Sequence, residues 1–336
     1  MKKLSFYLIA LLLIPVISFT GCKDDEKVEP AFTTLTNYLT ANNMDLSEIL
    51  TYHGASGDVK FVAGPPADGD AAAMTAFLAK YYIIDIRQPA DYAAGHIDGA
   101  KNVTFGSVLG EIALAGDQPI LVVCYSGQTA CYATALLRLS GAPDAQALKW
   151  GMSGWNPANA VNSWDTKIGA NEADGHNNWS TAGAPTNVTY DAPVLTETGD
   201  GATILAARIA TVVAAGFGPA TASGSDVLTT PTNYFINNYF SDADYAAFGH
   251  IDGAFRIQPL TVADGQILNL DPAADVVTYC YTGQTSAVIT AYLRVLGYDA
   301  YTMTYGMNGI YNTNAAWSSN QWGVDSNPKN HPVVTK

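Results

Sequence analysis

The sequence has little cysteine, with 4 residues in 336, and no two cysteines stand at the Cys-x-x-Cys spacing. This excludes a small disulfide-stabilised scaffold and a zinc or redox site of that spacing. Charged residues are also scarce, at 14%, and 16 Lys and Arg against 30 Asp and Glu give a net charge of -14. Because nucleic-acid binding depends on neutralising phosphates, we expect no nucleic-acid partner.

Long apolar runs are absent except at the N-terminus, where residues 4–19 follow two lysines and include Pro15. A run of this length is short for a membrane span of about 18 or more residues and is typical of a signal peptide. It ends in Phe19-Thr20-Gly21-Cys22, which resembles a bacterial lipobox with Phe19 in the usual place of Leu. We therefore predict a lipoprotein signal peptide over 1–21 and lipidation of Cys22, with an ordinary secretory signal as the alternative.

The segment after Cys22 is polar, and we predict that residues 22–31 form an unfolded tether. Several acyl chains on one cysteine give a stable membrane anchor. The acidic residues Asp24, Asp25 and Glu26 also resemble surface-export signals of some lipoproteins. These features predict a lipoprotein of the cell envelope, in the outer membrane and facing the periplasm or the cell surface.

The rest of the chain contains a domain-sized repeat. His96 and His250, in two Gly-His-Ile-Asp-Gly-Ala segments, are 154 positions apart, and Cys124 and Cys280 are 156 apart. Hydrophobic residues make up 48% of the chain, enough for a sizeable core in each copy. We predict two tandem domains over 32–175 and 196–336, joined by a linker over 176–195.

Both copies alternate strands with helices, which predicts an α/β fold with a parallel sheet flanked by helices. The expected elements are strands at Tyr81–Ile86, Pro119–Val123 and Val276–Tyr279 and helices ending or lying at Met74–Lys80, Thr129–Leu139, Thr203–Ala215 and Ser286–Leu296. Ligands of such sheets bind at the carboxyl ends of the strands, where Cys124 and Cys280 stand.

Each copy places the sequence Cys-Tyr-Ser/Thr-Gly-Gln-Thr between a strand and a helix. The unpaired amides at the helix start and the helix dipole stabilise an anion, so we predict a lowered thiol pKa at Cys124 and Cys280. Gly127 and Gly283 allow the backbone to curl around the sulfur with positive φ. Further hydroxyl donors are expected from Ser126, Thr129, Thr282 and Thr285.

The ordered set of motifs resembles the rhodanese domain. It comprises Asp85-Ile86-Arg87, the Gly95–Ala100 turn, the Cys124–Thr129 loop and the Gly151–Trp155 segment. The resemblance implies a central five-stranded parallel sheet in each domain and a sulfurtransferase activity. In that family a cysteine takes sulfane sulfur from a donor such as thiosulfate, holds it as a persulfide and passes it to cyanide or a thiol.

Cys124 and Cys280 are then the catalytic residues, and Asp85 and Arg87 are orienting residues. The substrate-binding loops are Tyr125, Ser126, Gly127, Gln128 and Thr129 in the first copy and Tyr281, Thr282, Gly283, Gln284 and Thr285 in the second. Fixed amides suffice to stabilise a persulfide anion, so we expect small sulfur-containing substrates and neither a metal nor an organic cofactor.

The second copy departs from the pattern, since Asn237-Asn238-Tyr239 stands where the first has Asp85-Ile86-Arg87. Tyr125 and Tyr281 also occupy a position where many family members have arginine. These departures motivate an alternative function, a non-catalytic rhodanese-like binding module displayed on the envelope.

Other reactive residues have simpler interpretations. Cys131 lies within a predicted helix, and Ala287 occupies the equivalent position of the second copy. We therefore expect Cys131 to be a buried packing residue. His96 and His250 are expected to be structural, as the resemblance implies, and the tryptophans are expected to pack. A Cys-based phosphatase needs arginine six positions after its cysteine, but Ala130 and Ser286 stand there. A disulfide between Cys124 and Cys280 stays open at this point.

Overall fold

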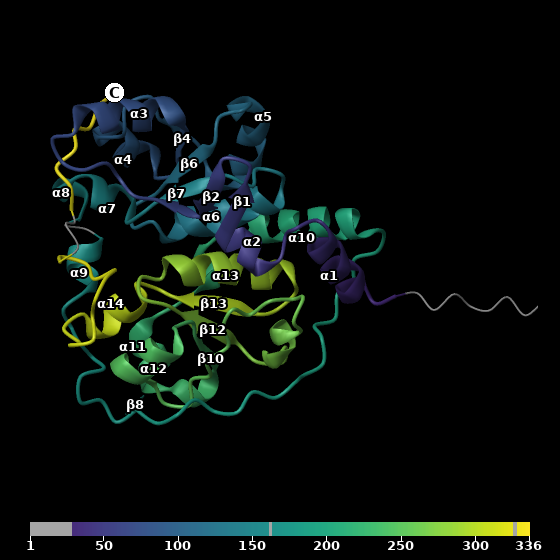
Figure 1. The fold of residues 1–336 in the computed structure, drawn as a ribbon. Coiled ribbons are helices and arrows are strands. Elements are labelled where there is room, and N and C mark those ends of the chain that lie inside the picture. The colour runs from purple at the N-terminus through teal and green to yellow at the C-terminus, as the bar shows by residue number, and fades with distance from the viewer. Residues whose placement is uncertain (1–28, 161–162, 325–327) are drawn as a thin grey trace, which may run out of the picture.

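The computed structural model describes residues 29–160, 163–324 and 328–336 and places two α/β domains against each other (Figure 1). The predicted signal peptide, the lipidation site at Cys22 and most of the tether lie outside the described residues. Within the described ranges, no helix combines the length and the apolar character that crossing a bilayer requires.

The first domain contains a five-stranded parallel sheet, which confirms the predicted fold. Its strands, in spatial order, are β3 (Val62–Ala63), β7 (Gln146–Leu148), β6 (Ile120–Val123), β4 (Tyr82–Asp85) and β5 (Lys101–Asn102). All four residues of β6 are buried, as expected for a strand with both faces covered. The β4–β6 pairing ends at Asp85 and Val123, so the next residue, Cys124, lies at the carboxyl edge of the sheet.

The second domain has a four-stranded parallel sheet rather than five strands. Its strands, in spatial order, are β10 (Phe235–Asn238), β12 (Val276–Tyr279), β13 (Ala300–Met303) and β9 (Thr221–Ala222). Where the first domain has β5, a single parallel bridge joins Asn237 to Phe255. The β10–β12 pairing ends at Asn238 and Tyr279, directly before Cys280.

The helices predicted from the sequence are present, with bounds within two residues of most expectations. The α-helices are α1 (Ala31–Ala41), α2 (Leu46–Leu50), α3 (Ala71–Lys80), α4 (Pro89–Ala94), α5 (Glu111–Ala115), α6 (Gln128–Leu139), α7 (Gly151–Trp155), α8 (Pro157–Ala160), α9 (Trp164–Lys167), α10 (Gly201–Ala215), α11 (Gly224–Thr229), α12 (Asp242–Phe248), α13 (Gln284–Val295) and α14 (Gly306–Tyr311). A hairpin of β1 (Thr51–Gly54) and β2 (Gly57–Lys60) precedes β3.

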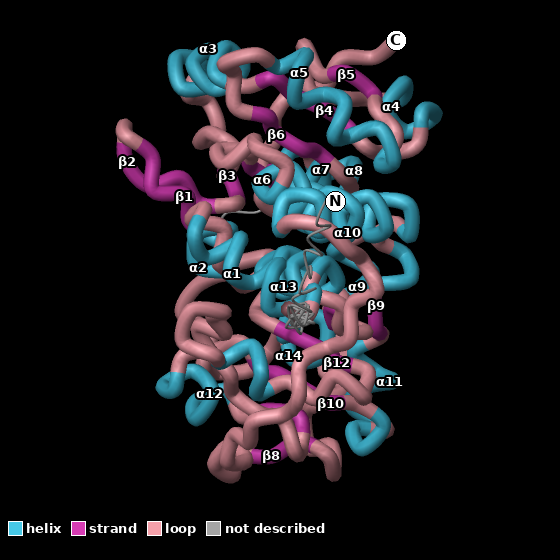
Figure 2. The backbone as a smooth tube through the Cα atoms, turned by 90° about the vertical axis from the view of Figure 1, so that its right-hand side faces the viewer, coloured by secondary structure: helices cyan, strands magenta, loops and turns pink. Residues whose placement is uncertain are grey.

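A layer of helices between the two sheets joins the domains into one unit (Figure 2). Helix α6 packs on α13, and α1 packs on α10. Leu136 and Leu137 of the first domain and Ile289 and Leu293 of the second are fully buried in the same hydrophobic cluster. Because burial of each such side chain contributes about 1.5–3 kcal/mol, this shared core holds the domains firmly together.

The connecting segments cross between the domains. Strand β8 (Trp179–Ser180), within the expected linker over 176–195, pairs antiparallel with β11 (His250–Ile251) of the second domain. The C-terminal segment, expected within the domain 196–336, returns instead to the first domain, where Val334 forms an antiparallel bridge with His96. Figure 1 shows this segment in yellow, reaching the first domain beside α3. Each Gly-His-Ile-Asp-Gly turn is thus paired with a segment that follows the other copy in the chain. We call these two segments, β8 and the stretch around Val334, the straps.

Candidate active site

The first cysteine loop surrounds the Cys124 sulfur with backbone amides. The loop leaves β6 and enters α6 through Gly127, which has a φ of 88°. The Cys124 Sγ accepts hydrogen bonds from the amides of Gly127 at 3.1 Å and Ala130 at 3.3 Å. This is the amide cradle predicted from the position of the cysteine between a strand and a helix.

The second loop repeats the backbone path but surrounds its sulfur differently. Gly283 has a φ of 73°, and the Ser286 amide donates to the Cys280 Sγ at 3.4 Å. The Cys280 thiol also lies 3.7 Å from the Ser286 hydroxyl, which in turn is 2.5 Å from the Thr302 hydroxyl. Sequence analysis missed this hydroxyl pair, although comparison of the copies reveals it, because Ser286 stands where the first loop has Ala130.

Two of the four expected hydroxyl donors, Ser126 and Thr282, accept hydrogen bonds within their own loops. The Ser126 hydroxyl accepts from the Gln128 side-chain amide at 3.1 Å, and the Thr282 hydroxyl accepts from the Gln284 backbone amide at 3.2 Å. These bonds stabilise the loops. The Cys124 sulfur accepts hydrogen bonds from backbone amides, so the first cradle is built by the main chain.

Both sulfurs are enclosed, which overturns the predicted low pKa of Cys124. Cys124 and Cys280 are only 2% and 1% exposed. Burial raises the pKa of the Cys124 thiol, against the lowering effect of the Ala130, Ser126 and Gly127 amides. The amides could be expected from the sequence, but not the extent to which the sulfur is buried. Because its pKa is raised above the ordinary thiol value, the thiol form is favoured at neutral pH.

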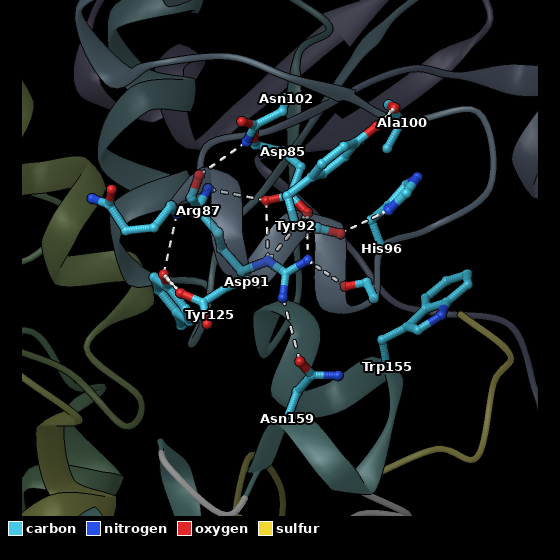
Figure 3. A network of polar contacts seen from close by, with 12 residues as sticks. Asp85, Arg87, Asp91, Tyr92, His96, Ala100, Asn102, Tyr125, Trp155 and Asn159 are labelled. Carbon is cyan, nitrogen blue, oxygen red and sulfur yellow. Dashed lines mark hydrogen bonds and ion pairs between the residues drawn. The ribbon is translucent and has the colours of Figure 1, made fainter. Parts of the chain in front are cut away.

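Tyr125 and Tyr281 point their hydroxyls at carboxylates on α4 and α12, the helices that carry Asp91 and Asp244. The Tyr125 hydroxyl donates to Asp91 at 2.5 Å and accepts from the Gln88 amide at 3.1 Å, as Figure 3 shows in part. The Tyr281 hydroxyl makes the matching 2.5 Å bond to Asp244. Each tyrosine therefore braces its own loop, and Tyr125 is still 41% exposed beside the enclosed cysteine.

Asp85 and Arg87 form a buried ion pair behind the first loop (Figure 3). The Arg87 guanidinium donates to the Asp85 carboxylate at 2.7 Å and to the Gly95 carbonyl at 2.7 Å. It also donates to the Asn159 side chain at 3.3 Å. The pair thus ties the end of β4 to the Gly-His-Ile-Asp-Gly turn, and its orienting role stays a prediction.

The second domain lacks this ion pair. The residues equivalent to Asp85 and Arg87 each lie one position later in the chain than the sequence alone predicted. Strand register places Asn238 opposite Tyr279, as Asp85 lies opposite Val123, so Asn238 and Phe240 replace Asp85 and Arg87. The Asn238 side chain donates to the Tyr279 hydroxyl at 2.8 Å. Phe240 is fully buried and stacks on Tyr281 at 4.3 Å. An aromatic contact therefore takes the place of the ionic one.

The two motif histidines pack within their turns. His96 is stacked on Tyr92 at 3.8 Å, and its Nδ1 lies 2.8 Å from the Tyr92 carbonyl. His250 is stacked on Tyr245 at 3.9 Å, and burial lowers its pKa. These contacts agree with the structural role expected for both.

The remaining cysteine is a packing residue, as predicted. Cys131 is fully buried in α6, and burial raises its pKa strongly. Cys124, Cys131 and Cys280 are all free thiols, so the disulfide left open by the sequence is not formed. Among the residues described, no group of three or more His, Cys, Asp or Glu side chains is placed to hold a metal ion. The tryptophans Trp150, Trp164 and Trp322 form one buried cluster.

Comparison with known proteins identifies the family. The model of the Rhodanese-like domain matches residues 70–158 and 240–313. A thiosulfate sulfurtransferase GlpE of Pseudomonas paraeruginosa is 37% identical over 91 residues, covering 27% of this chain and 80% of that protein. The GlpE of Shewanella oneidensis is 39% identical over 79 residues, 23% of this chain and 78% of its own. The chain belongs to the rhodanese-like family.

Solved structures with similarity over both domains have low identity. A thiosulfate sulfurtransferase from Pseudomonas aeruginosa is 15% identical, covering 86% of this chain and 48% of its own, with a TM-score of 0.29. The 3-mercaptopyruvate sulfurtransferase SseA of Escherichia coli is 17% identical, covering 77% of this chain and 99% of its own, with a TM-score of 0.26.

Proposed function

We propose that the protein is a sulfurtransferase that moves sulfane sulfur through persulfides on Cys124 and Cys280. The observation that carries this proposal is the pair of amides, from Gly127 and Ala130, directed at the Cys124 sulfur. Fixed donors of this kind stabilise a persulfide anion without reorganisation. The similarity to thiosulfate sulfurtransferases makes thiosulfate the first donor to test.

The reaction begins when the Cys124 thiol loses its proton, since the thiolate is the nucleophile. The thiolate attacks the outer sulfur of thiosulfate, the sulfur–sulfur bond of the donor breaks, and sulfite leaves with the electron pair. An acceptor, either cyanide or a thiolate, then attacks the outer sulfur of the persulfide and regenerates the cysteine thiolate. Cys280 follows the same sequence, with the Ser286 amide and hydroxyl at its sulfur.

Mass spectrometry of the full chain after incubation with thiosulfate tests the proposal. Each reactive cysteine gains one sulfur, about 32 Da, so the wild type gains two sulfurs and Cys124→Ala or Cys280→Ala gains one. The double variant gains none and has no thiosulfate-to-cyanide turnover. Cys131→Ala is the matched control, because alanine occupies the equivalent position 287, and it keeps both additions.

The rate of persulfide formation at Cys124, followed by the same mass spectrometry, is expected to depend on pH. Because the pKa of Cys124 is raised, its persulfide forms faster as the pH rises from neutrality past the ordinary thiol pKa of about 8.5. A rate at Cys124 that is already maximal at pH 7 contradicts this expectation. Turnover by the double cysteine variant at the parent rate overturns the sulfurtransferase assignment itself.

One observation favours a second candidate, a binding module without turnover. Both cysteines are almost completely enclosed, and the thiol form of Cys124 is favoured. Wild-type protein that gains no sulfur from thiosulfate, 3-mercaptopyruvate or a persulfide donor supports this alternative.

We also propose that Cys22 carries a lipid anchor that holds both domains outside the cytoplasm, at the outer membrane. The support is the sequence pattern of the apolar run and Phe19-Thr20-Gly21-Cys22. Metabolic labelling with a palmitate analogue is expected to label the wild type and leave Cys22→Ser unlabelled. Equal labelling of both contradicts the anchor, and fractionation of the labelled protein tests the membrane assignment.

A further inference from the structure

Two glutamines, one in each cysteine loop, form hydrogen bonds to the other domain. Gln128, in the loop of Cys124, accepts a hydrogen bond from the Tyr305 amide of the second domain at 2.8 Å. Gln284, in the loop of Cys280, accepts from the Trp150 amide of the first domain at 3.1 Å. Both glutamines are 2% exposed, and the bond of Gln284 to Trp150 is buried whereas that of Gln128 to Tyr305 is partly buried.

The acceptors matter because Trp150 and Tyr305 have strained backbones. Their φ angles are 66° and 61°, in the left-handed region that costs a residue with a side chain about 1–2 kcal/mol. A buried backbone amide also needs an acceptor. For Trp150 the acceptor comes from Gln284, so the second domain stabilises a strained residue of the first.

Trp150 leads into a segment that is bonded to Cys124. It precedes Gly151 and Met152, and the Met152 amide donates to the Cys124 carbonyl at 2.8 Å. The Gln284 side chain also packs on the cradle directly, since a Cβ at Gly127 would lie 2.8 Å from Gln284 Oε1. The amide of that same Gly127 holds the Cys124 sulfur. Gln284 therefore contacts the Cys124 loop at Gly127 and also bonds to Trp150, at the start of the segment that holds the Cys124 carbonyl.

The two glutamines differ in the hydrogen bonds of their side-chain NH2 groups. The Gln128 side-chain amide donates to Ser126, in its own loop, whereas the Gln284 Nε2 is buried without a hydrogen-bond partner. An unpaired buried amide costs about 1–3 kcal/mol, and Gln284 keeps its orientation despite this cost. The bond to Trp150 and the contact with Gly127 account for that orientation.

We propose that Gln284 is a positioning residue for Cys124, so that the first cysteine works at full rate only with the second domain in place. This inference rests on the proposed function for its sulfur-transfer readout. It also makes a statement about thiol reactivity that holds for any chemistry at Cys124. The reciprocal bond gives Gln128 the matching role toward Cys280.

The test measures the reactivity of each cysteine separately in the full-length Gln284→Met variant, which keeps the side-chain length but has no strong acceptor. Peptide mass spectrometry follows iodoacetamide alkylation against pH and persulfide formation from thiosulfate. We expect the reactivity of Cys124 to fall about five- to ten-fold, as for loss of one buried hydrogen bond, and its pH midpoint to rise. The loss at Cys124 exceeds any loss at Cys280 by at least about five-fold.

Thr290→Val is the matched control, because Thr290 is fully buried in α13, the helix of Gln284, and its hydroxyl has no partner. It is expected to leave both cysteines unchanged. Equal losses at the two cysteines, no change at Cys124, or faster alkylation of Cys124 overturns the inference, because each outcome means that Gln284 only closes the interface. If wild type forms no persulfide, the proposed function fails while the alkylation result still decides the role of Gln284.

Discussion

Replacement of Arg87 by Phe is expected to lower the free energy of unfolding by about 3–5 kcal/mol, since it leaves the buried Asp85 carboxylate without its partner. Asp85 is fully buried and Arg87 is 3% exposed, so water cannot replace the guanidinium. The Gly95 carbonyl also loses its donor. Urea unfolding followed by tryptophan fluorescence measures the change.

The second domain supplies the control for this prediction. It carries Asn238 and Phe240 at the positions of Asp85 and Arg87. The double variant Asp85→Asn/Arg87→Phe removes the uncompensated charge, so it is expected to recover at least about 2 kcal/mol of the loss. A double variant less stable than Arg87→Phe alone contradicts the view that the ion pair and the aromatic contact are interchangeable solutions.

Gly151→Ala is expected to cost about 3–4 kcal/mol in stability and to reduce sulfur transfer at Cys124 more than at Cys280. Gly151 has a φ of 60°, and a Cβ there would lie 2.5 Å from the Cys124 carbonyl oxygen and 2.6 Å from the Gly127 amide nitrogen. The cradle must therefore shift. Thermal unfolding and site-resolved persulfide formation give the two readouts.

Gly265→Ala isolates the contribution of the close contact. Gly265 has a left-handed backbone, with a φ of 70° and a ψ of 6°, but an added Cβ there meets nothing within 4 Å. The control is expected to cost only the backbone strain, about 1 kcal/mol, and to leave both cysteines reactive. Equal losses in the two variants mean that strain alone explains the effect at Gly151.

Much of the fold could be predicted because each copy is locally consistent. The apolar strand 120–123, the helix that follows it and the cysteine between them are all encoded within a short stretch of sequence. Residues 276–279 repeat the pattern, and the observed strand has the predicted bounds. The second sheet differed at its edge, where one bridge at Phe255 replaces a strand that the family resemblance implied.

The site was less predictable because its surroundings come from distant parts of the chain. The amides around Cys124 follow from local sequence, but its raised pKa follows from burial in a hydrophobic cluster that residues of both domains form. Similarly, Gln284 contacts Trp150 across 134 positions. The predicted alignment of Asp85 with Asn237 was also wrong by one position, and the pairing of the strands shows Asn238 instead.

The crossed straps fix the order in which the molecule is completed. The bridge between His96 and Val334 joins the first copy to residues that follow both sheets in the chain. During synthesis, the His96 turn therefore lacks its strap until the strands of both sheets have emerged, whereas β8 is made before its partner β11. If the gene is divided between the two copies, each turn is separated from its strap. Neither half alone then retains the native pairing at its Gly-His-Ile-Asp-Gly turn.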